Sequence, residues 1–229
     1  MRRAFFAVIT VAATVVALTA DTPQLVRDRT LARFFAPTTP PLVSYRALRH
    51  VSASTRGGKM SATLVAETSL DPAAGFSYRV VSEDGSGLIQ RKVLLAALEA
   101  EQKAVRGNDA RQSALTLDNY DFLGVSQASD SLVKVDIHPR RKEVMLIDGS
   151  LLLKPDTSQL VRLEGELSAR PSFWTRRVRV VREYAEIMGV HVPVAMRSAA
   201  DVLIVGASTF EMTYQYEEIN GQIVRSVSR

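Results

Sequence analysis

The chain has 229 residues, of which 46% are hydrophobic and 23% are charged, so its composition excludes an intrinsically disordered protein. This length suits one large domain with a substantial core. The chain has no cysteine, which excludes disulfides, thiolate metal sites, cysteine nucleophiles and lipid attachment at a processed cysteine.

The first 20 residues predict an export signal. Arg2 and Arg3 precede an apolar run from Ala4 to Ala20, and small residues stand near its end. This order is typical of a secretory signal peptide, with cleavage after Ala17 or Ala20. The alternative is an uncleaved membrane anchor, for which the run is at the short end. We expect the protein to be located in the periplasm. We expect a mildly basic exported chain to contact anionic lipid or cell-wall polymer rather than nucleic acid.

The mature chain is expected to begin with a helix and a linker over residues 21–41, followed by a single domain over 42–229. The helix is predicted over 22–36, because Thr22 is a suitable N-cap and Pro23 a suitable first helical residue. The PTTPP segment that follows ends the helix and leads into the domain.

Most of the domain alternates apolar and polar residues with a period of two, which predicts β-strands. The expected strand segments are 45–55, 59–70, 76–83, 120–128, 131–138, 143–154, 159–167, 175–184 and 209–227. Two-residue hairpin turns are expected inside 143–154, at Asp148-Gly149, and inside 209–227, at Asn220-Gly221. The pattern therefore gives roughly nine to eleven strands.

One longer helix is predicted over 86–106. Ser86 can serve as its N-cap, and the next residue after the helix is a glycine, which is a common C-terminal stop. Ile89 and Val93 begin an apolar stripe that Leu94 and Leu98 widen, so one face of this helix is expected to lie against the sheet.

These elements predict a mainly β (α+β) fold. Short turns between successive strands require antiparallel pairing. Because nearly every strand has one apolar and one polar face, a single large sheet must bury its apolar face against the helices. A sheet of this size also twists and curls. We therefore expect a curved antiparallel sheet whose apolar concave side is partly lidded by helices.

The segment RPSFWTRRVRV (170–180) has two interpretations. Basic residues interleaved with aromatic ones are typical of nucleic-acid sites. The period of two instead favours a strand whose arginines form a solvated face, with Arg177 and Arg179 paired to acids such as Glu164 and Glu166 on the preceding strand. We expect the solvated face.

Phe173 and Trp174 precede that strand and are unusual in a turn. They either cover an edge of the sheet or stand at the mouth of a cavity. Val181 and Arg182 interrupt the alternation later in the strand and predict a bulge.

Three segments resemble the periplasmic outer-membrane lipoprotein-sorting proteins, the Lol-type carrier superfamily. They are IDGSLLLKPDTSQLVRLEGEL, VREYAEIMGVHVPVAM and STFEMTYQYEEINGQI, and the matched positions include Asp156, Val161, Arg162, Glu164 and the run Gly189-Val190-His191-Val192-Pro193. The resemblance covers about the last third of the chain. It implies an unclosed antiparallel barrel whose concave apolar face, lidded by helices, holds acyl chains. It also implies a basic residue that holds the lid, for which Arg46 and Arg49 on the first strand are candidates.

The side chains expected to contact a ligand are apolar and come from several strands, the long helix and the aromatic turn. They are Phe76, Tyr78, Leu95, Leu98, Val135, Ile137, Phe173, Trp174, Phe210, Met212, Tyr214 and Tyr216. Aromatic and methionine side chains suit an adaptable apolar cavity. The alternative for each of them is ordinary core packing.

No catalytic or metal-binding pattern is present in the sequence. His50, His138 and His191 stand singly, without a partner at the spacing that metal sites use. Ser86 lacks the five-residue pattern of a nucleophile elbow. We therefore expect no metal, no cofactor and no enzymatic activity, although an acid–base pair assembled from distant strands stays open.

The predicted function is that of an exported carrier or sensor that binds a lipid or a lipidated protein in the concave cavity and contacts the membrane at most peripherally. The alternative is a structural envelope protein with a filled core and no ligand, which docks a protein partner through its aromatic turn and basic strand.

Overall fold

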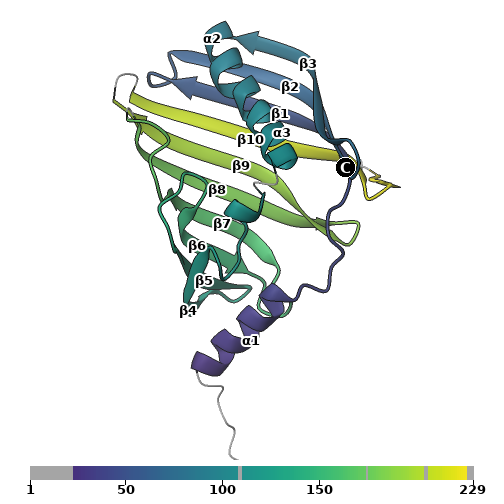
Figure 1. Cartoon of the computed structure of the whole chain (residues 1–229), viewed down its shortest axis with the longest axis vertical. Helices are drawn as coiled ribbons and strands as arrows, with labels where there is room; N and C mark the ends of the chain where they lie inside the picture. The colour runs from purple at the N-terminus through teal and green to yellow at the C-terminus, as the bar shows by residue number, and fades with distance from the viewer. Residues whose placement is uncertain (1–22, 108–109, 174, 204–205, 226–229) are drawn as a thin grey trace, which may run out of the picture.

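The computed structural model describes residues 23–107, 110–173, 175–203 and 206–225, and a single antiparallel sheet of 11 strands is its central feature (Figure 1). The strand order is β3-β2-β1-β10-β9-β8-β7-β6-β5-β4, with β11 paired to the end of β10. The sheet is not closed, because β3 and β4 form its two edges. The predicted mainly β class and the unclosed antiparallel sheet are confirmed.

The first half of the described chain contains the helices. Its elements are α1 (Pro23–Phe35), β1 (Tyr45–Thr55), β2 (Met60–Asp71), β3 (Gly75–Gly85), α2 (Gly87–Ile89), the π-helical turn η1 (Gln90–Leu95), α3 (Ala96–Gly107) and α4 (Ala110–Ser113). Strands make up the rest: β4 (Tyr120–Ser129), β5 (Leu132–Pro139), β6 (Ile147–Leu153), β7 (Leu160–Leu167), β8 (Thr175–Ile187), β9 (Val190–Val202), β10 (Gly206–Ile219) and β11 (Gln222–Ile223).

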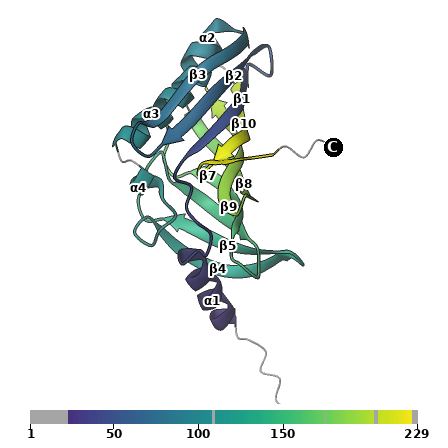
Figure 2. The same ribbon diagram turned by 90° about the vertical axis from the view of Figure 1, so that its right-hand side faces the viewer.

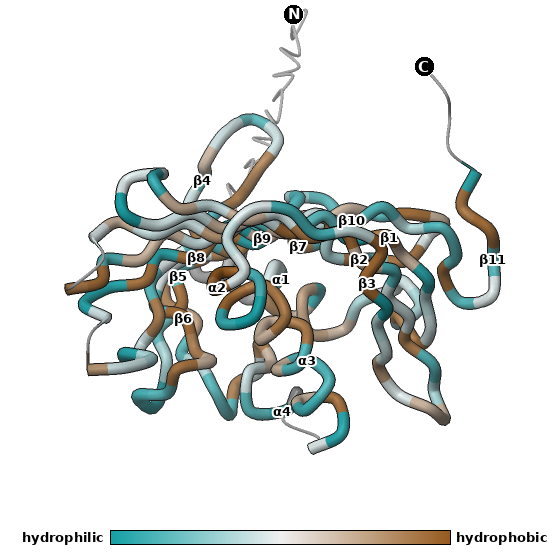
Figure 3. Tube along the Cα trace, turned by 90° about the horizontal axis from the view of Figure 1, so that it is seen from above, coloured by the Kyte–Doolittle hydropathy of each residue, from teal (hydrophilic) through white to brown (hydrophobic). Residues whose placement is uncertain are grey.

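The sheet is curved, and helices α2, α3 and α4 lie on its concave side (Figures 2 and 3). The helical segment α2–η1–α3 packs on β1, β2 and β3. Helix α1 packs at the other end of the sheet, where the rings of Phe34 and Phe35 contact Phe122 of β4. Helices thus cover two separate parts of the apolar face, as the one-sided patterning of the strands predicts.

The buried apolar side chains form two clusters. The first, which we call the lid cluster, lies between α2–η1–α3 and strands β1, β2, β3 and β10, and includes Phe76, Ile89, Leu94, Leu98, Met212 and Tyr216. The second, the α1 cluster, is formed by strands β4 to β8 with side chains of α1, and includes Tyr120, Phe122, Val135, Ile137, Leu151, Leu163 and Val180.

The predicted turn at Asp148-Gly149 is wrong, because both residues lie inside β6. Gly149 pairs with Gly165 of β7. A Cβ atom added to Gly149 would lie 2.0 Å from the carbonyl oxygen of Glu164. Gly149 therefore permits a close approach of the β6 and β7 backbones. Such an approach is, like a turn, a common reason for a glycine in a β protein.

The predicted turn at Asn220-Gly221 is confirmed between β10 and β11. Both residues have positive φ angles, 49° and 78°, as a two-residue hairpin turn requires. The Asn220 side chain also holds the linker that follows α1: its Oδ1 accepts hydrogen bonds from the backbone N–H of Val43 and Ser44, and its Nδ2 donates to the carbonyl of Pro41.

Strand β8 confirms the solvated interpretation of the basic segment. Arg177 and Arg179 both pair with Glu166 of β7, at 3.2 and 3.8 Å. The predicted interruption at Val181 and Arg182 is wrong in its position. The register with β9 shifts two residues later, between Glu183 and Tyr184, so the alternation continues through Arg182 and places it on the concave side.

Candidate functional site

The segment α2–η1–α3 covers the lid cluster, and a π-helical turn sets which side chains it buries. Ile89, Leu94 and Leu98 are buried against the sheet, whereas Val93 is 39% exposed. The predicted stripe through Val93 is therefore wrong. In a π-helical turn, residues five apart share a face, so Leu94 rather than Val93 follows Ile89.

Arg49 of β1 joins the sheet to this helical lid. Its side chain is 1% exposed and reaches Glu101 of α3, where Nη1 and Nη2 donate to the two carboxylate oxygens at 2.5 and 2.8 Å. Nη2 also donates to the hydroxyl of Tyr45. The bidentate geometry is the strong form of the arginine–carboxylate pair. We refer to the Arg49–Glu101 pair as the latch.

The other candidate for this role, Arg46, does not hold the lid. It pairs with Glu218 of β10 at 2.9 Å, and its side chain is 60% exposed. Arg46 and Arg49 are three residues apart on a strand and therefore face opposite sides of the sheet.

Aromatic rings enclose the latch arginine. The Arg49 guanidinium carbon lies 4.5 Å from the ring centroid of Tyr214, 5.0 Å from that of Phe76 and 5.9 Å from that of Tyr45. These distances are within the range of cation–π attraction, which is stronger when the cation is desolvated. Two of these rings, Phe76 and Tyr214, belong to the predicted ligand-binding set.

Burial perturbs the ionisable groups around the latch. Burial alone would lower the pKa of Arg49, but the hydrogen bond to Glu101 and the nearby phenol and carboxylate oxygens outweigh it and raise that pKa. Burial raises the pKa values of Tyr45, Tyr214 and Tyr216, and the Arg49 charge only partly opposes this effect. The latch is thus a charged pair inside a site whose phenols stay neutral.

The predicted ligand-binding residues fall into three groups. Those of the lid cluster are close together beneath the lid: Phe76, Leu98, Met212 and Tyr216 are buried, and Tyr78, Leu95, Phe210 and Tyr214 are partly buried against them. Val135 and Ile137 lie apart from these, in the α1 cluster. Phe173 is 81% exposed, and Trp174 lies outside the described residues. Contact of any of them with a ligand remains a prediction.

A cavity of about 570 Å³ lies elsewhere on the concave side, between α1 with its linker, the segment around α4, and strands β7, β8 and β9. Its lining includes Arg33, Phe34, Leu163, Arg182, Tyr184 and His191, and none of the predicted ligand-binding residues. Sequence reasoning missed this cavity. The signal that could have found it is the period of two, which continues from Val180 through Arg182 to Tyr184.

His191 is one wall of this cavity. Its Nε2 donates to the carbonyl of Leu160 on β7, and its ring stacks on that of Tyr184 with the centroids 5.3 Å apart. These contacts fix the orientation of the His191 ring against β7 and β8.

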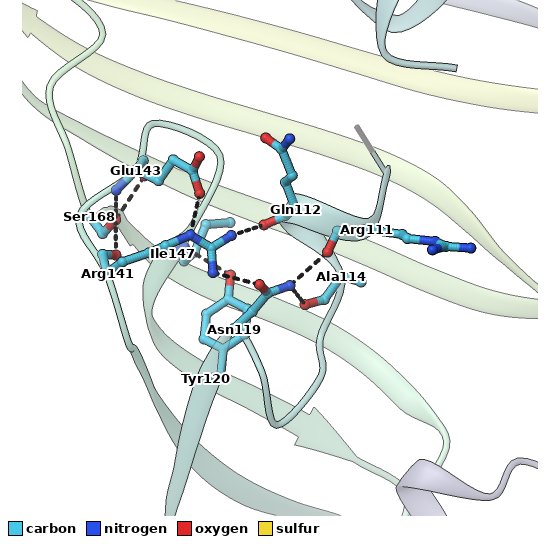
Figure 4. A network of polar contacts seen from close by, with 9 residues as sticks. All are labelled: Arg111, Gln112, Ala114, Asn119, Tyr120, Arg141, Glu143, Ile147 and Ser168. Atoms are coloured by element: carbon cyan, nitrogen blue, oxygen red, sulfur yellow. Dashed lines mark hydrogen bonds and ion pairs between the residues drawn. The ribbon is translucent and has the colours of Figure 1, made fainter. Parts of the chain in front are cut away.

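A network of polar contacts fixes the wall formed by residues 113–115 (Figure 4). The Asn119 amide donates to the carbonyls of Arg111 and Ala114, and Arg141 donates to Asn119 Oδ1 and to the carbonyl of Gln112. The short helix α4 and the residues after it are therefore held to the start of β4 and to the loop after β5.

The described residues contain no group of three or more histidine and acidic side chains placed to hold a metal ion. None of the helices in the part of the chain that the structure describes is long and apolar enough to cross a membrane.

No family model and no curated protein sequence matches the chain. Among solved structures, a DUF1329 family protein from Desulfovibrio piger is similar with a TM-score of 0.39 and 12% identity, over 91% of this chain and 96% of that one. A LolA superfamily protein from Nitrosomonas europaea is similar with a TM-score of 0.39 and 10% identity, over 88% of this chain and 94% of that one. The superfamily that the sequence resembles is thus represented among the structural neighbours. At these values the relationship is distant and carries no argument about a ligand.

Proposed function

We propose that the chain is an exported, non-catalytic carrier or sensor that binds the acyl chain of a lipid or lipidated protein on the concave apolar face, beneath the lid α2–η1–α3. The signal predicted over residues 1–20 would place it in the periplasm. The observation that carries the proposal is the latch, a buried ion pair that joins the sheet to a helical lid over an apolar surface.

A buried ion pair is a poor way to stabilise a permanent core. The free energy of removing both charges from water offsets much of their attraction, and apolar replacements are often neutral or stabilising. The pair has a clearer use in a lid that moves, because Glu101, with about a third of its side chain exposed, can return to water when the contact opens. The Arg49 side chain, enclosed by rings, would stay with the sheet.

Opening the lid would expose an apolar surface of suitable chemistry. Leu94, Leu95 and Leu98 leave the lid cluster with the helix, and the strand residues Phe76, Met212 and Tyr214 remain on the sheet. Methionine side chains adapt to irregular apolar partners, and aromatic side chains are common in the lining of ligand sites. The lid's own side chains thus occupy the surface that an acyl chain would take.

A filled-core protein that docks a partner is the second candidate, and a specific observation favours it. Phe76 and Leu98 are only 2% and 0% exposed, so the surface beneath the lid is fully packed in this state. In that candidate the lid never opens, and the exposed Phe173 beside the basic strand β8 belongs to the docking surface.

Mass spectrometry of an organic extract of the protein, purified from the periplasm of an expression host, separates the two candidates. The proposal predicts a stoichiometric phospholipid, fatty acid or acylated peptide, and saturable binding of a fluorescent fatty acid by delipidated protein. A lipid-free extract from protein that also fails to bind the fluorescent fatty acid would contradict it and leave the filled-core candidate.

A further inference from the structure

Arg182 of β8 faces the concave side without a counter-ion. Its Nε is buried and has no hydrogen-bond partner, and no carboxylate in the described part of the chain pairs with it. The outward arginines of the same strand differ, since Arg177 and Arg179 both pair with Glu166. A guanidinium stays charged at every accessible pH. A partly buried charge of this kind raises the free energy of the folded protein unless an anion compensates it.

Arg182 lines the 570 Å³ cavity, and a second arginine is among the residues of that lining. Arg33 contributes this second guanidinium, while no aspartate or glutamate occurs among the described residues that line the cavity. Arg33 donates to the backbone carbonyl of Asp156 rather than to a carboxylate. Low-dielectric walls and charges of one sign focus a positive potential inside a cavity.

The cavity also has an apolar wall. Phe34 of α1, Leu115 after α4, and Leu160 and Leu163 of β7 contribute to it. The volume falls within the roughly 300–1,000 Å³ of small-molecule sites, which combine apolar walls with a few placed polar groups. A small hydrophilic anion would leave this wall unused, and a neutral lipid would leave Arg182 uncompensated.

Contacts outside the cavity hold its walls in place. The Asn119–Arg141 network fixes the segment 113–115 (Figure 4). Asn220 fixes the linker at Pro41. Walls that are set before a ligand arrives reduce the entropy lost on binding.

We infer that this cavity binds an anionic amphiphile, with its carboxylate or phosphate group paired to Arg182 and its chain along the apolar wall. The inference goes beyond the proposed function, because it names a second site and the charge of the head group that this site binds. It rests on the proposed function for the lipidic nature of the ligand. It does not require the lid α2–η1–α3 to open, since the cavity lies outside the lid cluster.

Calorimetric titration of the full chain tests the inference with three probes: laurate, dodecanol, which has the same chain length without the charge, and inorganic phosphate. The wild-type protein is expected to bind laurate more tightly than dodecanol. It is expected to bind inorganic phosphate only weakly. Arg182→Met should reduce laurate affinity by about 30-fold or more, because it removes one partner of a desolvated charge pair. The matched control Arg179→Met, on the outer face of the same strand, should leave the affinity unchanged.

The thermal stability of the unliganded variant gives a second readout that does not depend on binding. If Arg182 lacks a counter-ion, Arg182→Met should keep or raise the melting temperature. A clear fall would show that contacts within the chain compensate the charge, and it would overturn the inference.

The binding outcomes separate this inference from the proposed function. Equal affinity for laurate and dodecanol, unchanged by Arg182→Met, would overturn the anionic site and leave the acyl-binding proposal standing. If phosphate bound as tightly as laurate, the inference that the ligand is an amphiphile would be overturned, and the cavity would be a site for a free anion. Failure of both laurate and dodecanol to bind would overturn the inference and the proposed function together.

Discussion

Arg49 and Glu101 form a bidentate ion pair between the first strand of the sheet and helix α3, with donor–acceptor distances of 2.5 and 2.8 Å. The two residues are 52 positions apart in the chain, so only the folded sheet brings them together. The pair lies beside the rings of Phe76 and Tyr214. It is the main polar link between the lid and the face that the lid covers, and the predictions below begin with it.

Breaking the latch on one side should destabilise the protein strongly. Glu101→Gln leaves the Arg49 charge buried without its carboxylate, and we expect a loss of about 3 kcal/mol in the free energy of unfolding, at the lower end for buried pairs because Glu101 is partly exposed. Urea denaturation measures it. Glu218→Gln, which breaks the exposed pair with Arg46, is the matched control and should cost at most about 1 kcal/mol. Equal losses in the two variants would contradict a special role for the latch.

Stability should fall steeply at alkaline pH. The pKa values of Tyr45 and Tyr216 are raised above the ordinary value of 10.0 by burial. A raised pKa in the folded state means that the stabilisation is complete below the unfolded pKa and is lost as the pH rises above it. Each buried tyrosine should therefore remove roughly 1.4 kcal/mol per pH unit above about pH 10. Urea denaturation between pH 9 and 11 (about one unit on either side of the unfolded pKa) measures this slope.

Tyr216→Phe supplies the control for that slope. It removes one titrating phenol together with its hydrogen bond to the Pro193 carbonyl. The variant should be less stable at neutral pH and should lose stability less steeply above pH 10. An unchanged slope would show that this tyrosine ionises equally in the folded and unfolded states.

The close approach of β6 and β7 makes a prediction about their glycines. A Cβ at Gly165 would lie 2.2 Å from the carbonyl oxygen of Asp148, so Gly165→Ala must push the two strands apart. We expect a loss of about 3 kcal/mol, as for severe overpacking. Gly124→Ala is the control, because nothing lies within 4 Å of its added Cβ, and thermal unfolding should change little. A tolerated alanine at Gly165 would contradict the pairing of Gly165 with Gly149.

Asn220 should stabilise the linker as well as the hairpin. Asn220→Gly keeps the positive φ of 49° accessible but removes the side-chain contacts with Pro41, Val43 and Ser44. We expect a loss of about 1–3 kcal/mol from these hydrogen bonds. Asn220→Asp keeps the acceptor oxygen and should lose less. Hydrogen exchange at the Val43 and Ser44 amides should accelerate in the glycine variant, and unchanged exchange there would contradict the contact.

The sequence predicts the architecture well where local pattern decides it. Strict alternation in segment 131–138 correctly predicts a strand and the face that it buries. The Asn220-Gly221 pair correctly predicts the hairpin turn between β10 and β11. The same logic fails at Asp148-Gly149, because a glycine serves either a turn or a close backbone approach, and only the partner strand decides which. It fails again at Val93, because a π-helical turn shifts the helical period without a mark in the sequence.

The sequence predicts the candidate site only in part, because the site is formed by residues that are far apart in the chain and meet only in the folded sheet. Arg49 is one of two arginines that the sequence offers for the lid, and its partner Glu101 is not identifiable from local pattern. At Arg182 the sequence predicts a bulge, since a charged residue at an inward position breaks the expected alternation. Its role as an unpaired charge depends on which side chains line the cavity, because none of the described lining residues is an aspartate or glutamate.

A reversible lock on the lid tests the central claim most directly. A Cβ atom added at Gly75 would be in van der Waals contact with the Val105 side chain of α3, 3.6 Å from its Cγ1, so cysteines at these two positions would be neighbours. The chain has no native cysteine to interfere. In the variant Gly75→Cys/Val105→Cys, the oxidised and reduced forms share any strain from the positive φ at position 75, so comparison of the two isolates lid movement. Both forms also carry Arg182→Met, so that the separate 570 Å³ cavity contributes little to fatty-acid binding. We predict that the oxidised form binds a fluorescent fatty acid at least about 10-fold more weakly than the reduced form, a difference of about 1.4 kcal/mol. Equal binding by the two forms would show that acyl chains do not enter beneath the lid and would contradict the account.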